Sequence, residues 1–363
     1  MKKLVLTGGP CGGKTTGMSY LEQKLLDRGK YPLIVPEAPT LLMLGKLSPM
    51  TGAFDERTFQ RAVVGTVALL EEEFERAALA CRHADPILLC DRGIADAAAY
   101  MPSGLYEEIL HELHLGTPVE VRDGRYDAVF HMRTAADGAL SSYSTANNEV
   151  RREDAALALV RDKATEEAWI GHPHLRILDN STDFPGKLHK LERWVCAALG
   201  IPVPLEIERK FLCRPVRWED IPVACQDISI EQTYLQSADP DAVLRVRKRG
   251  QHGSHLYYRT EKRDVKEGVR EEKEERISKE VYEACLSFRL PGTRPIRKQR
   301  WCFVWKNQYF ELDSIPRRDG VLFMLELELT EENQSVELPP FLSIAKEVTD
   351  DPAYSNYALS KAA

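Results

Sequence analysis

The C-terminal part of the chain repeatedly places two like charges two residues apart. The pairs are Glu206 and Glu208, Arg245 and Arg247, Glu272 and Glu274, Lys298 and Arg300, Glu311 and Asp313, and Glu326 and Glu328. Residues i and i+2 of a β-strand project from the same face, so each pair forms a column of one sign. Like charges side by side repel unless an opposite charge lies between them. Acidic columns therefore predict bound cations, and basic columns predict a bound polyanion.

The residues next to several of these pairs are apolar. Leu325, Leu327 and Leu329 alternate with one acidic pair, and Leu244 and Val246 flank the arginines. An apolar face must pack against another layer. In a small closed sheet the charged face then points into the interior, where it can hold one ligand. A solvated sheet face is the alternative for any single pair, but together the pairs predict an α+β antiparallel β-barrel with a metal–polyphosphate site.

An ordered series of motifs accompanies the columns. It opens with Glu206-Ile-Glu-Arg-Lys210 and closes with Tyr354-Ser-Asn356. Between them come Gln232-Thr-Tyr-Leu235, Leu-Arg-Val-Arg-Lys at 244–248, Thr260-Glu-Lys262, Arg270-Glu-Glu-Lys-Glu274, Lys298-Gln-Arg300, Glu311-Leu-Asp313 and Glu326-Leu-Glu328. Residues 206–357 thereby resemble a CYTH domain of the triphosphate tunnel metalloenzyme superfamily, and we expect the domain at 204–363.

The resemblance implies a triphosphate tunnel lined by both kinds of charge. Carboxylates would hold one or two divalent cations, Mg²⁺ or Mn²⁺, which prefer oxygen ligands. Basic side chains would bind the triphosphate, because guanidinium groups match phosphate oxygens, and Lys210 and Arg247 would also act in catalysis. The implied metal ligands are Glu206, Glu208, Glu326 and Glu328, with Asp313 as a further candidate. The implied phosphate ligands are Lys210, Arg245, Arg247, Lys262, Lys298 and Arg300.

The N-terminus carries a second motif of high specificity. A short apolar run at 3–7 leads directly into Gly8-Gly-Pro-Cys-Gly-Gly-Lys-Thr-Thr16, and a helical pattern follows. This is G-x-x-x-x-G-K-[ST] in the strand, loop and helix context that a P-loop requires. Loop N–H groups would cradle phosphates, Lys14 would reach the β- and γ-phosphates, and the Thr15 hydroxyl would bind Mg²⁺. The expected nucleotide ligands are Gly8, Gly9, Pro10, Cys11, Gly12, Gly13, Lys14, Thr15 and Thr16.

Two acidic residues follow further apolar runs. Asp91 ends the run Pro-Ile-Leu-Leu-Cys, where a carboxylate that orders Mg²⁺ is expected in such domains; an ordinary turn is the alternative. Glu37 follows Leu-Ile-Val and would orient or deprotonate an acceptor hydroxyl, with helix capping as the alternative. Apolar runs at 126–132 and 175–178 also read as strands. We therefore predict an α/β P-loop NTPase domain, a parallel sheet flanked by helices.

Two later segments predict further contacts to the nucleotide. Arg151 and Arg152 open a charged helix and are candidates for a lid over the transferred phosphate, with a solvated, salt-bridged helix face as the alternative. Asn180-Ser-Thr-Asp183 follows the last apolar run, where related domains contact the base. It is similar to the guanine-reading Asn-Lys-x-Asp motif, with serine in place of lysine. The nucleotide is therefore ATP or GTP, with a slight preference for guanine.

Residues 1–200 resemble the NadR-like group of P-loop ATPases and kinases, through the P-loop, Asp91-Arg-Gly and the His172-Pro pair. Leu199-Gly-Ile-Pro-Val-Pro204 is the expected linker. The two-domain order is similar to the TRPL-translocation-defect family of GTP-binding proteins. That resemblance implies nucleotide binding and allows contact with phosphoinositides.

Composition and charge limit the partners. The chain has 363 residues, a net charge of −7, and 43% hydrophobic and 29% charged residues, which fits a globular protein of two domains. Neither half is strongly basic, so we expect no DNA partner, and the balance argues against an extended RNA footprint. The eight cysteines form no C-x-x-C pair, which argues against structural zinc and a disulfide framework. No apolar run approaches the length of a spanning helix, and we expect a cytoplasmic location.

Three functions fit these motifs. The first, which we favour, is an enzyme: a P-loop kinase or NTPase joined to a metal-dependent domain that binds or hydrolyses a triphosphate. Its partners would be a nucleoside triphosphate and a second phosphorylated small molecule. The second is a regulatory ATP- or GTP-binding protein whose tunnel binds a phosphorylated ligand, such as a phosphoinositide, without turnover. The third is the processing of RNA 5′-triphosphates.

Overall fold

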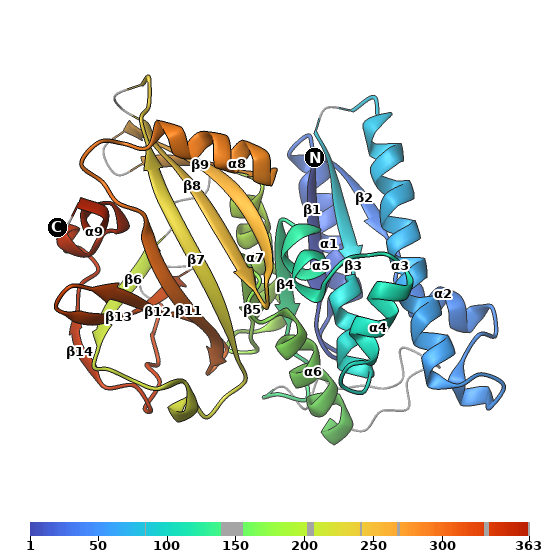
Figure 1. Ribbon diagram of the computed structural model, residues 1–363. Coiled ribbons are helices and arrows are strands. Elements are labelled where there is room, and N and C mark those ends of the chain that lie inside the picture. Colours follow the sequence, from blue (N-terminus) through green and yellow to red (C-terminus); the bar gives the residue numbers. More distant parts are fainter. Residues whose placement is uncertain are drawn as a thin grey trace. The chain divides into compact units, whose positions relative to one another are not determined.

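The computed structural model of the protein describes residues 1–83, 85–138, 155–201, 207–239, 242–266, 269–329 and 334–361, without the side chains of 207, 263–266 and 269–272. The chain divides into two compact units, Met1–Val203 and Pro204–Ala363 (Figure 1). Three of the predicted site residues, Arg151, Arg152 and Glu206, lie outside the described residues.

The first unit is built on a parallel sheet. Its strands are β1 (Lys2–Thr7), β2 (Tyr31–Val35), β3 (Pro86–Asp91), β4 (Ala128–Met132) and β5 (Leu175–Leu178), in the order β2-β3-β1-β4-β5. These strands are the apolar runs of the sequence, which a parallel sheet needs because helices bury both of its faces. β3 pairs directly with β1, and this brings the end of β3 next to the loop that follows β1.

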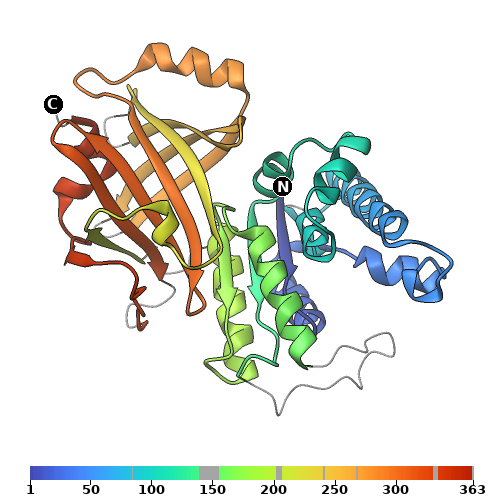
Figure 2. The same cartoon turned by 60° about the horizontal axis from the view of Figure 1, so that its bottom comes forward.

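Helices cover both faces of this sheet (Figures 1 and 2). α1 (Lys14–Asp27) and α7 (Phe184–Ala198) pack on one face, where Leu21 and Leu191 join Phe130 in one buried cluster. α3 (Glu56–Leu79) lies on the other face, where its buried Glu71 accepts a hydrogen bond from Lys3 at 3.1 Å. The other helices are α2 (Ala38–Leu44), η1 (Pro49–Thr51), η2 (Ile94–Tyr100), α4 (Leu105–Glu112), α5 (Pro118–Gly124) and α6 (Ala155–Trp169).

The second unit is built on a strongly curved antiparallel sheet (Figure 2). Its strands are β6 (Ile207–Cys213), β7 (Cys225–Leu235), β8 (Ala242–Gln251), β9 (Ser254–Lys266), β10 (Val269–Ile277), β11 (Ile296–Trp305), β12 (Gln308–Arg317), β13 (Gly320–Leu329) and β14 (Ile344–Glu347). They lie in the order β10-β9-β8-β7-β11-β12-β13-β6-β14. Helical segments connect or follow them: η4 (Trp218–Asp220), α8 (Lys279–Cys285), η5 (Leu286–Phe288), η6 (Pro352–Tyr354) and α9 (Asn356–Lys361).

The strand register brings the charged columns onto one face of this sheet, which we call the charged face. Residues directly opposite each other in an antiparallel pair point to the same side. The opposed pairs include Glu208 and Glu328, Glu326 and Glu311, Asp313 and Arg300, Ile296 and Gln232, Gln232 and Arg247, and Thr260 and Glu274. Acids from β6, β12 and β13 therefore share this face with the basic columns of β8 and β11.

Part of the opposite face of the sheet is apolar. Phe303, Phe310 and Leu325 are buried there, in a cluster that the segments before β7 and after β13 cover. At one end the charged face gives way to apolar residues, where Leu359 of α9 packs with Ile296 and Ile315. The alternation expected from the sequence is confirmed, and α9 covers one end of the charged face.

The predicted fold class is confirmed, since an α/β unit of the P-loop type precedes an antiparallel β unit. The pairing order of the second unit runs linearly in the described residues, with β10 and β14 as its end strands. The expected barrel therefore takes the form of a curved sheet there. Among the described residues, none of the helices combines the length and the apolar character that crossing a membrane needs.

A substitution at Gly8 can test how closely the P-loop approaches β4. Its φ is +133°, and an added Cβ would lie 2.1 Å from the backbone oxygen of Met132. Gly29 has a φ of +72° with nothing within 4 Å of an added Cβ, so it is the matched control. We expect Gly29→Ala to lower the free energy of unfolding by about 1–2 kcal/mol through its left-handed backbone. Gly8→Ala should cost clearly more in urea unfolding, and equal losses would contradict the close approach.

Candidate functional site

The P-loop lies between β1 and α1 and is held against the end of β4. Gly13, with a φ of +87°, immediately precedes α1, and a Cβ on Gly12 would lie 2.5 Å from the Met132 oxygen. The Thr134 hydroxyl, just beyond β4, donates to the carbonyl of Pro10. The loop therefore leads directly into the N-terminus of α1, the position at which helices bind phosphate.

Lys14 is buried and folded back across the loop. Its Nζ donates to the carbonyls of Gly8 at 2.9 Å and Gly9 at 2.7 Å. The N–H of Gly9 donates to Oδ1 of Asp162 at 2.7 Å, and the other oxygen of Asp162 binds Arg133 at 2.9 Å. Asp162, on α6, thus anchors the start of the loop, a role that sequence spacing did not predict.

Glu37 and Asp91 converge with Lys14 at the carboxyl edge of the sheet. Glu37 Oε1 accepts from Nε of Arg92 at 2.7 Å, and Oε2 accepts from the Thr40 hydroxyl at 2.5 Å. Burial opposes ionisation of Glu37, but the charge of Arg92 and these hydrogen bonds lower its pKa to about 2. Glu37 occupies the N-cap position before α2, but its side chain makes no capping hydrogen bond to that helix.

Asp91 ends β3 beside this pair. Burial and the negative charge of Glu37 raise its pKa, while Lys14 and Arg92 oppose the shift. Its Oδ1 is buried and has no hydrogen-bond partner in the part of the chain that the structure describes. A buried acceptor without a donor is costly, and a hard cation is the partner that suits it. Asp91 therefore fits Mg²⁺, together with the exposed Thr15 at the start of α1.

Asn180 and Asp183, which were expected to contact the nucleotide base, form hydrogen bonds within the protein. Asn180 Nδ2 donates to the carbonyls of Thr134 at 2.8 Å and Asp137 at 2.7 Å, and its Oδ1 accepts from Lys187 at 2.7 Å. Asp183 caps α7 by accepting from the Gly186 N–H at 2.9 Å. These bonds fix the loop beside the P-loop and use the groups that would read a base edge, so base contact through either residue stays a prediction.

Two residues that the sequence analysis missed lie at the same place. The half-exposed ring of Phe184 lies 2.5 Å from where a Cβ on Gly13 would be. Lys187 is almost fully buried, and its Nζ donates to the carbonyls of Arg133 at 2.8 Å and Gly12 at 3.4 Å. Both follow the cap at Asp183, and only the helical spacing of α7 from that cap could have pointed to them.

On the charged face, Arg300 is buried among carboxylates. Its Nε and Nη2 donate to the two oxygens of Asp313, each at 2.7 Å, and Nη2 also donates to Glu326 at 2.6 Å. Nη1 contacts Glu311, and Lys298 contacts Asp313 as well. Burial alone would favour protonation, but Arg300 and Lys298 lower the pKa of the buried Asp313 to about 2. Asp313 is thus committed to two cations, which makes it the weakest of the predicted metal ligands.

Glu208 and Glu326 lie on either side of Lys210. The Lys210 Nζ is 2.9 Å from Oε2 of Glu208 and 3.5 Å from Oε1 of Glu326. Burial and then the charge of Glu326 raise the pKa of Glu208, although Lys210 and Arg300 oppose the shift. Oε1 of Glu326 is buried and lacks a hydrogen bond within the described ranges.

This donor set fits a divalent cation, which would be held by carboxylate oxygens. Glu328 lies opposite Glu208 in the register, and the sequence places Glu206 two residues before Glu208. In the described residues no three His, Cys, Asp or Glu side chains already form a metal cluster. Glu206 lies outside those residues, so the predicted set of four acids stays a prediction.

The basic columns complete the charged face. Arg247 Nη2 donates to both oxygens of Glu274, at 3.0 and 2.8 Å, and the Thr260 hydroxyl donates to the same carboxylate. Arg245 lies opposite Thr260, and Lys262 lies opposite Val243, two residues before Arg245, so both share the face. Arg249 extends the column and is buried; the sequence analysis missed it, although Arg245-Val-Arg247-Lys-Arg249 already shows the period of two.

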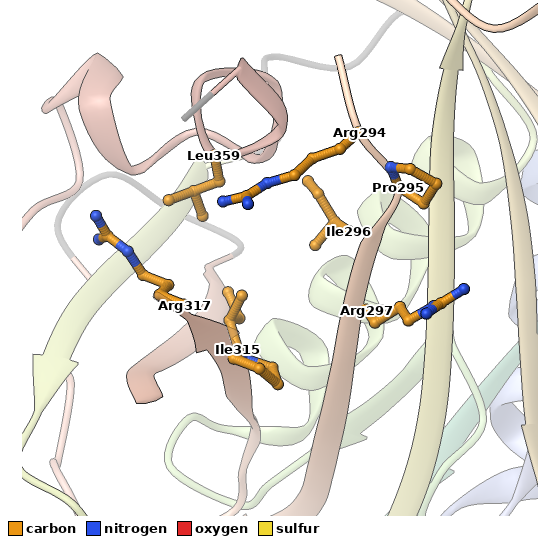
Figure 3. A pocket seen from close by; sticks show the side chains of 8 residues that line it. Arg294, Pro295, Ile296, Arg297, Ile315, Arg317 and Leu359 are labelled. Atoms are coloured by element: carbon orange, nitrogen blue, oxygen red, sulfur yellow. The ribbon is translucent and has the colours of Figure 1, made fainter. Parts of the chain in front are cut away.

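A small pocket lies at the end of the charged face that α9 covers (Figure 3). Ile296, Ile315 and Leu359 form its apolar floor, with arginines around it. Its volume of about 40 Å³ has room for a few water molecules. Arg297 on its rim is exposed and paired with Glu231 at 2.7 Å. The pocket is too small for a triphosphate, and we assign it no ligand.

Comparison with known proteins places both units in families. A family model described as an AAA domain matches residues 3–187, more than half of the 363 residues. The chain belongs to the AAA domain family. A second model, described as a CYTH domain, matches residues 204–347. The chain therefore joins an N-terminal AAA domain, of the P-loop type, to a C-terminal CYTH domain, and the predicted pair of domains is confirmed.

Several solved structures resemble part of the chain, and each covers less than half of it. The inorganic triphosphatase NE1496 is 27% identical, with 44% of this chain and 97% of that chain covered, at a TM-score of 0.34. A putative adenylyl cyclase, HpAC1 from Hippeastrum, described as having a dominant triphosphatase activity, is 18% identical over 35% of this chain and 80% of its own, at 0.28. Protein PH1819 from Pyrococcus horikoshii is 21% identical with the same coverage and score. All three scores are low, so the assignment rests on the two family matches. No curated protein matches the chain.

Lys187 predicts a pH dependence of stability in the AAA domain. Burial lowers its pKa from 10.5 to about 8. A lysine with a depressed folded-state pKa penalises folding fully below that pKa, and the penalty is relieved as pH rises from about 8 to 10.5. We therefore expect the unfolding free energy of the wild type to rise relative to Lys187→Met across this window, in urea titrations at several pH values. The exposed Lys46→Met is the control and should show no such rise; a flat difference for Lys187→Met would contradict the burial of its charge.

Arg300 predicts a large loss of stability in the CYTH domain. Arg300→Met would leave Asp313 and Glu326 buried with less compensating charge, and we expect a cost of about 3–5 kcal/mol. Arg209, on the same sheet, makes an exposed pair with Glu347 at 2.6 Å, so Arg209→Met should cost no more than about 1 kcal/mol. Chemical unfolding of both variants measures the difference. Similar small losses would show that the carboxylates around Arg300 are compensated in another way.

Proposed function

We propose that the protein is a two-site enzyme for triphosphates. The AAA domain would bind ATP or GTP with Mg²⁺ and transfer or hydrolyse the terminal phosphoryl group. The CYTH domain would bind a triphosphate with Mg²⁺ or Mn²⁺ and hydrolyse it. The observation that carries the proposal is the gathering of acidic and basic columns on one face of a curved sheet, in a chain that also has a complete P-loop.

The charged face supports triphosphate chemistry because its two kinds of charge are separated along the sheet. Acids predominate on β6 and β13, and the basic column of β8 lies on the other side of β11. A triphosphate lying across the face would meet Arg247 and Lys298 with its phosphate oxygens, and cations held by Glu208 and Glu326 would lie at the acidic side. A bound divalent ion supplies charge neutralisation and a polarised water in such sites.

The arrangement also supplies counter-charges that a ligand can exchange. Arg247 is paired with Glu274, and Lys210 lies between Glu208 and Glu326. An entering phosphate would compete with Glu274 for the guanidinium group, and an entering metal would compete with Lys210 for the acids. Metal and triphosphate together restore balance on both sides, which favours their binding as a complex over either alone.

In the AAA domain, Lys14, Glu37 and Asp91 support phosphoryl transfer. The loop amides and Lys14 would stabilise the phosphates, since such transfer depends on positioning and electrostatic stabilisation. Asp91 and Thr15 would hold the Mg²⁺ that neutralises charge on the leaving group. Glu37 would orient the acceptor hydroxyl or water. On sequence grounds alone, the proposal also includes a role for Arg151 or Arg152 in closing over the transferred phosphate.

Phosphate release from tripolyphosphate and from ATP or GTP tests the two sites separately. With Mg²⁺ or Mn²⁺, Lys14→Ala should reduce nucleotide turnover by the AAA domain at least about 100-fold, a loss typical of removing one group that stabilises developing charge. It should leave tripolyphosphate hydrolysis intact. Glu208→Gln should do the reverse, because it removes a metal ligand from the charged face.

The exposed Glu219 gives a matched control. Glu219→Gln should leave both activities at the wild-type level. If Lys14→Ala and Glu208→Gln reduced one activity equally, two independent sites would be excluded. Tight nucleotide binding without phosphate release from any substrate would favour a regulatory protein whose tunnel binds a phosphorylated ligand.

A further inference from the structure

Arg92 is a buried guanidinium group with an unused donor. It follows β3 directly, has a φ of +71° and is 9% exposed. Its Nε donates to Glu37, while its Nη1 lies 3.6 Å from Asp96 and makes no hydrogen bond within the described residues. Left-handed backbone is costly for arginine, and so is a buried donor without an acceptor. The left-handed backbone and the unsatisfied donor both occur at the residue that directly follows Asp91.

Arg161 brings a second guanidinium group to the same place from α6. Its carbon Cζ lies 4.9 Å from the centre of the Tyr100 ring, and Cζ of Arg92 lies 6.0 Å from the same centre. Arg161 Nη1 donates to the carbonyl of Ala99 at 3.0 Å. Its Nε is buried and, like Nη1 of Arg92, has no hydrogen-bond partner in the described ranges of the chain. Two guanidinium groups from two different elements, each with an unused donor, thus lie next to the Tyr100 ring.

The two acids beside Arg92 are already engaged by other donors. Asp96 accepts from the Gly93 N–H at 2.7 Å with one oxygen and from the Thr7 hydroxyl with the other. Glu37 is already bound by Arg92 Nε and by Thr40. An additional anion is therefore the group that would satisfy the two arginines, since guanidinium donors form strong charge-assisted hydrogen bonds with phosphate and carboxylate oxygens.

We propose that Arg92 and Arg161 form a subsite, with Tyr100, that binds an anionic group of the phosphoryl acceptor. The proposal rests on the phosphoryl-transfer function of the AAA domain and deepens it by naming the acceptor class: a molecule that carries a phosphate monoester or a carboxylate besides the hydroxyl that is phosphorylated. Glu37 links the two halves of this site, because it is bound to Arg92 and feels the charge of Lys14. The subsite is distinct from the P-loop, whose own donors serve the nucleotide.

Anion binding by the nucleotide-loaded full chain tests the subsite. The P-loop is first filled with Mg²⁺ and a non-hydrolysable ATP or GTP analogue, and equilibrium dialysis then measures the affinity for labelled inorganic phosphate or malonate. Arg161→Gln and the conservative Arg92→Lys should each weaken this binding about tenfold, the effect of one charge-assisted hydrogen bond. The exposed Arg76→Gln is the control and should bind as the wild type does. Sites on the charged face contribute equally to all four proteins, so the difference isolates the subsite.

The two probes distinguish the two kinds of anion. Weaker phosphate binding in the variants supports a phosphorylated acceptor, and weaker malonate binding alone supports a carboxylate. Unchanged binding of both probes in Arg161→Gln and Arg92→Lys overturns the subsite. If Arg92→Lys does not fold, Arg161→Gln decides by itself. Binding of the analogue is measured on every protein, and a wild type that binds no nucleotide would refute the function of the AAA domain instead of the subsite.

Discussion

The ion cluster around Arg300 is the constraint on which the charged face depends. Strand alternation places every charge in these columns on one side of the sheet, and a large apolar cluster packs on the opposite side. A face of this kind is stable only if its charges neutralise one another, because an uncompensated charge at low dielectric is expensive. Arg300 meets this need by binding Asp313 and Glu326 at once. The cluster fixes β11, β12 and β13 in register, and the other charged residues can then be arranged for a ligand.

The same principle shapes the P-loop, where polar groups are also satisfied from within. Lys14 binds the carbonyls of Gly8 and Gly9, and Asp162 binds the Gly9 N–H. Burial opposes ionisation of Asp162, but the adjacent His131 and Arg133 keep its pKa below the ordinary value. The polar groups at the start of the loop are therefore hydrogen-bonded within the chain itself.

The features that the sequence predicted are those with a local signal. The P-loop motif follows a strand directly, and the period of two placed Glu326 and Arg247 on the same face as the structure has them. The features that it missed depend on distant contacts. Asp162 contacts Gly9 across 153 residues of sequence, and Arg161 contacts Tyr100 from another element. The spacing of residues along a helix does not indicate which strand end that helix will cover. Asn180 shows the converse, because a local motif suggested base reading while its amide binds two carbonyls from the segment after β4.

Glu37 shows how the geometry narrows a choice that the sequence left open. A general base works best when its pKa lies near the working pH, yet Arg92 and Thr40 hold the pKa of Glu37 at about 2. Such a carboxylate is fully ionised and accepts a hydrogen bond well, but it is a poor acceptor of a proton. Phosphoryl transfer through a loose transition state asks little of a base and much of orientation. In the proposed phosphoryl transfer, the pairing with Arg92 would suit Glu37 to align the acceptor hydroxyl between phosphates near Lys14 and an anion near Arg92.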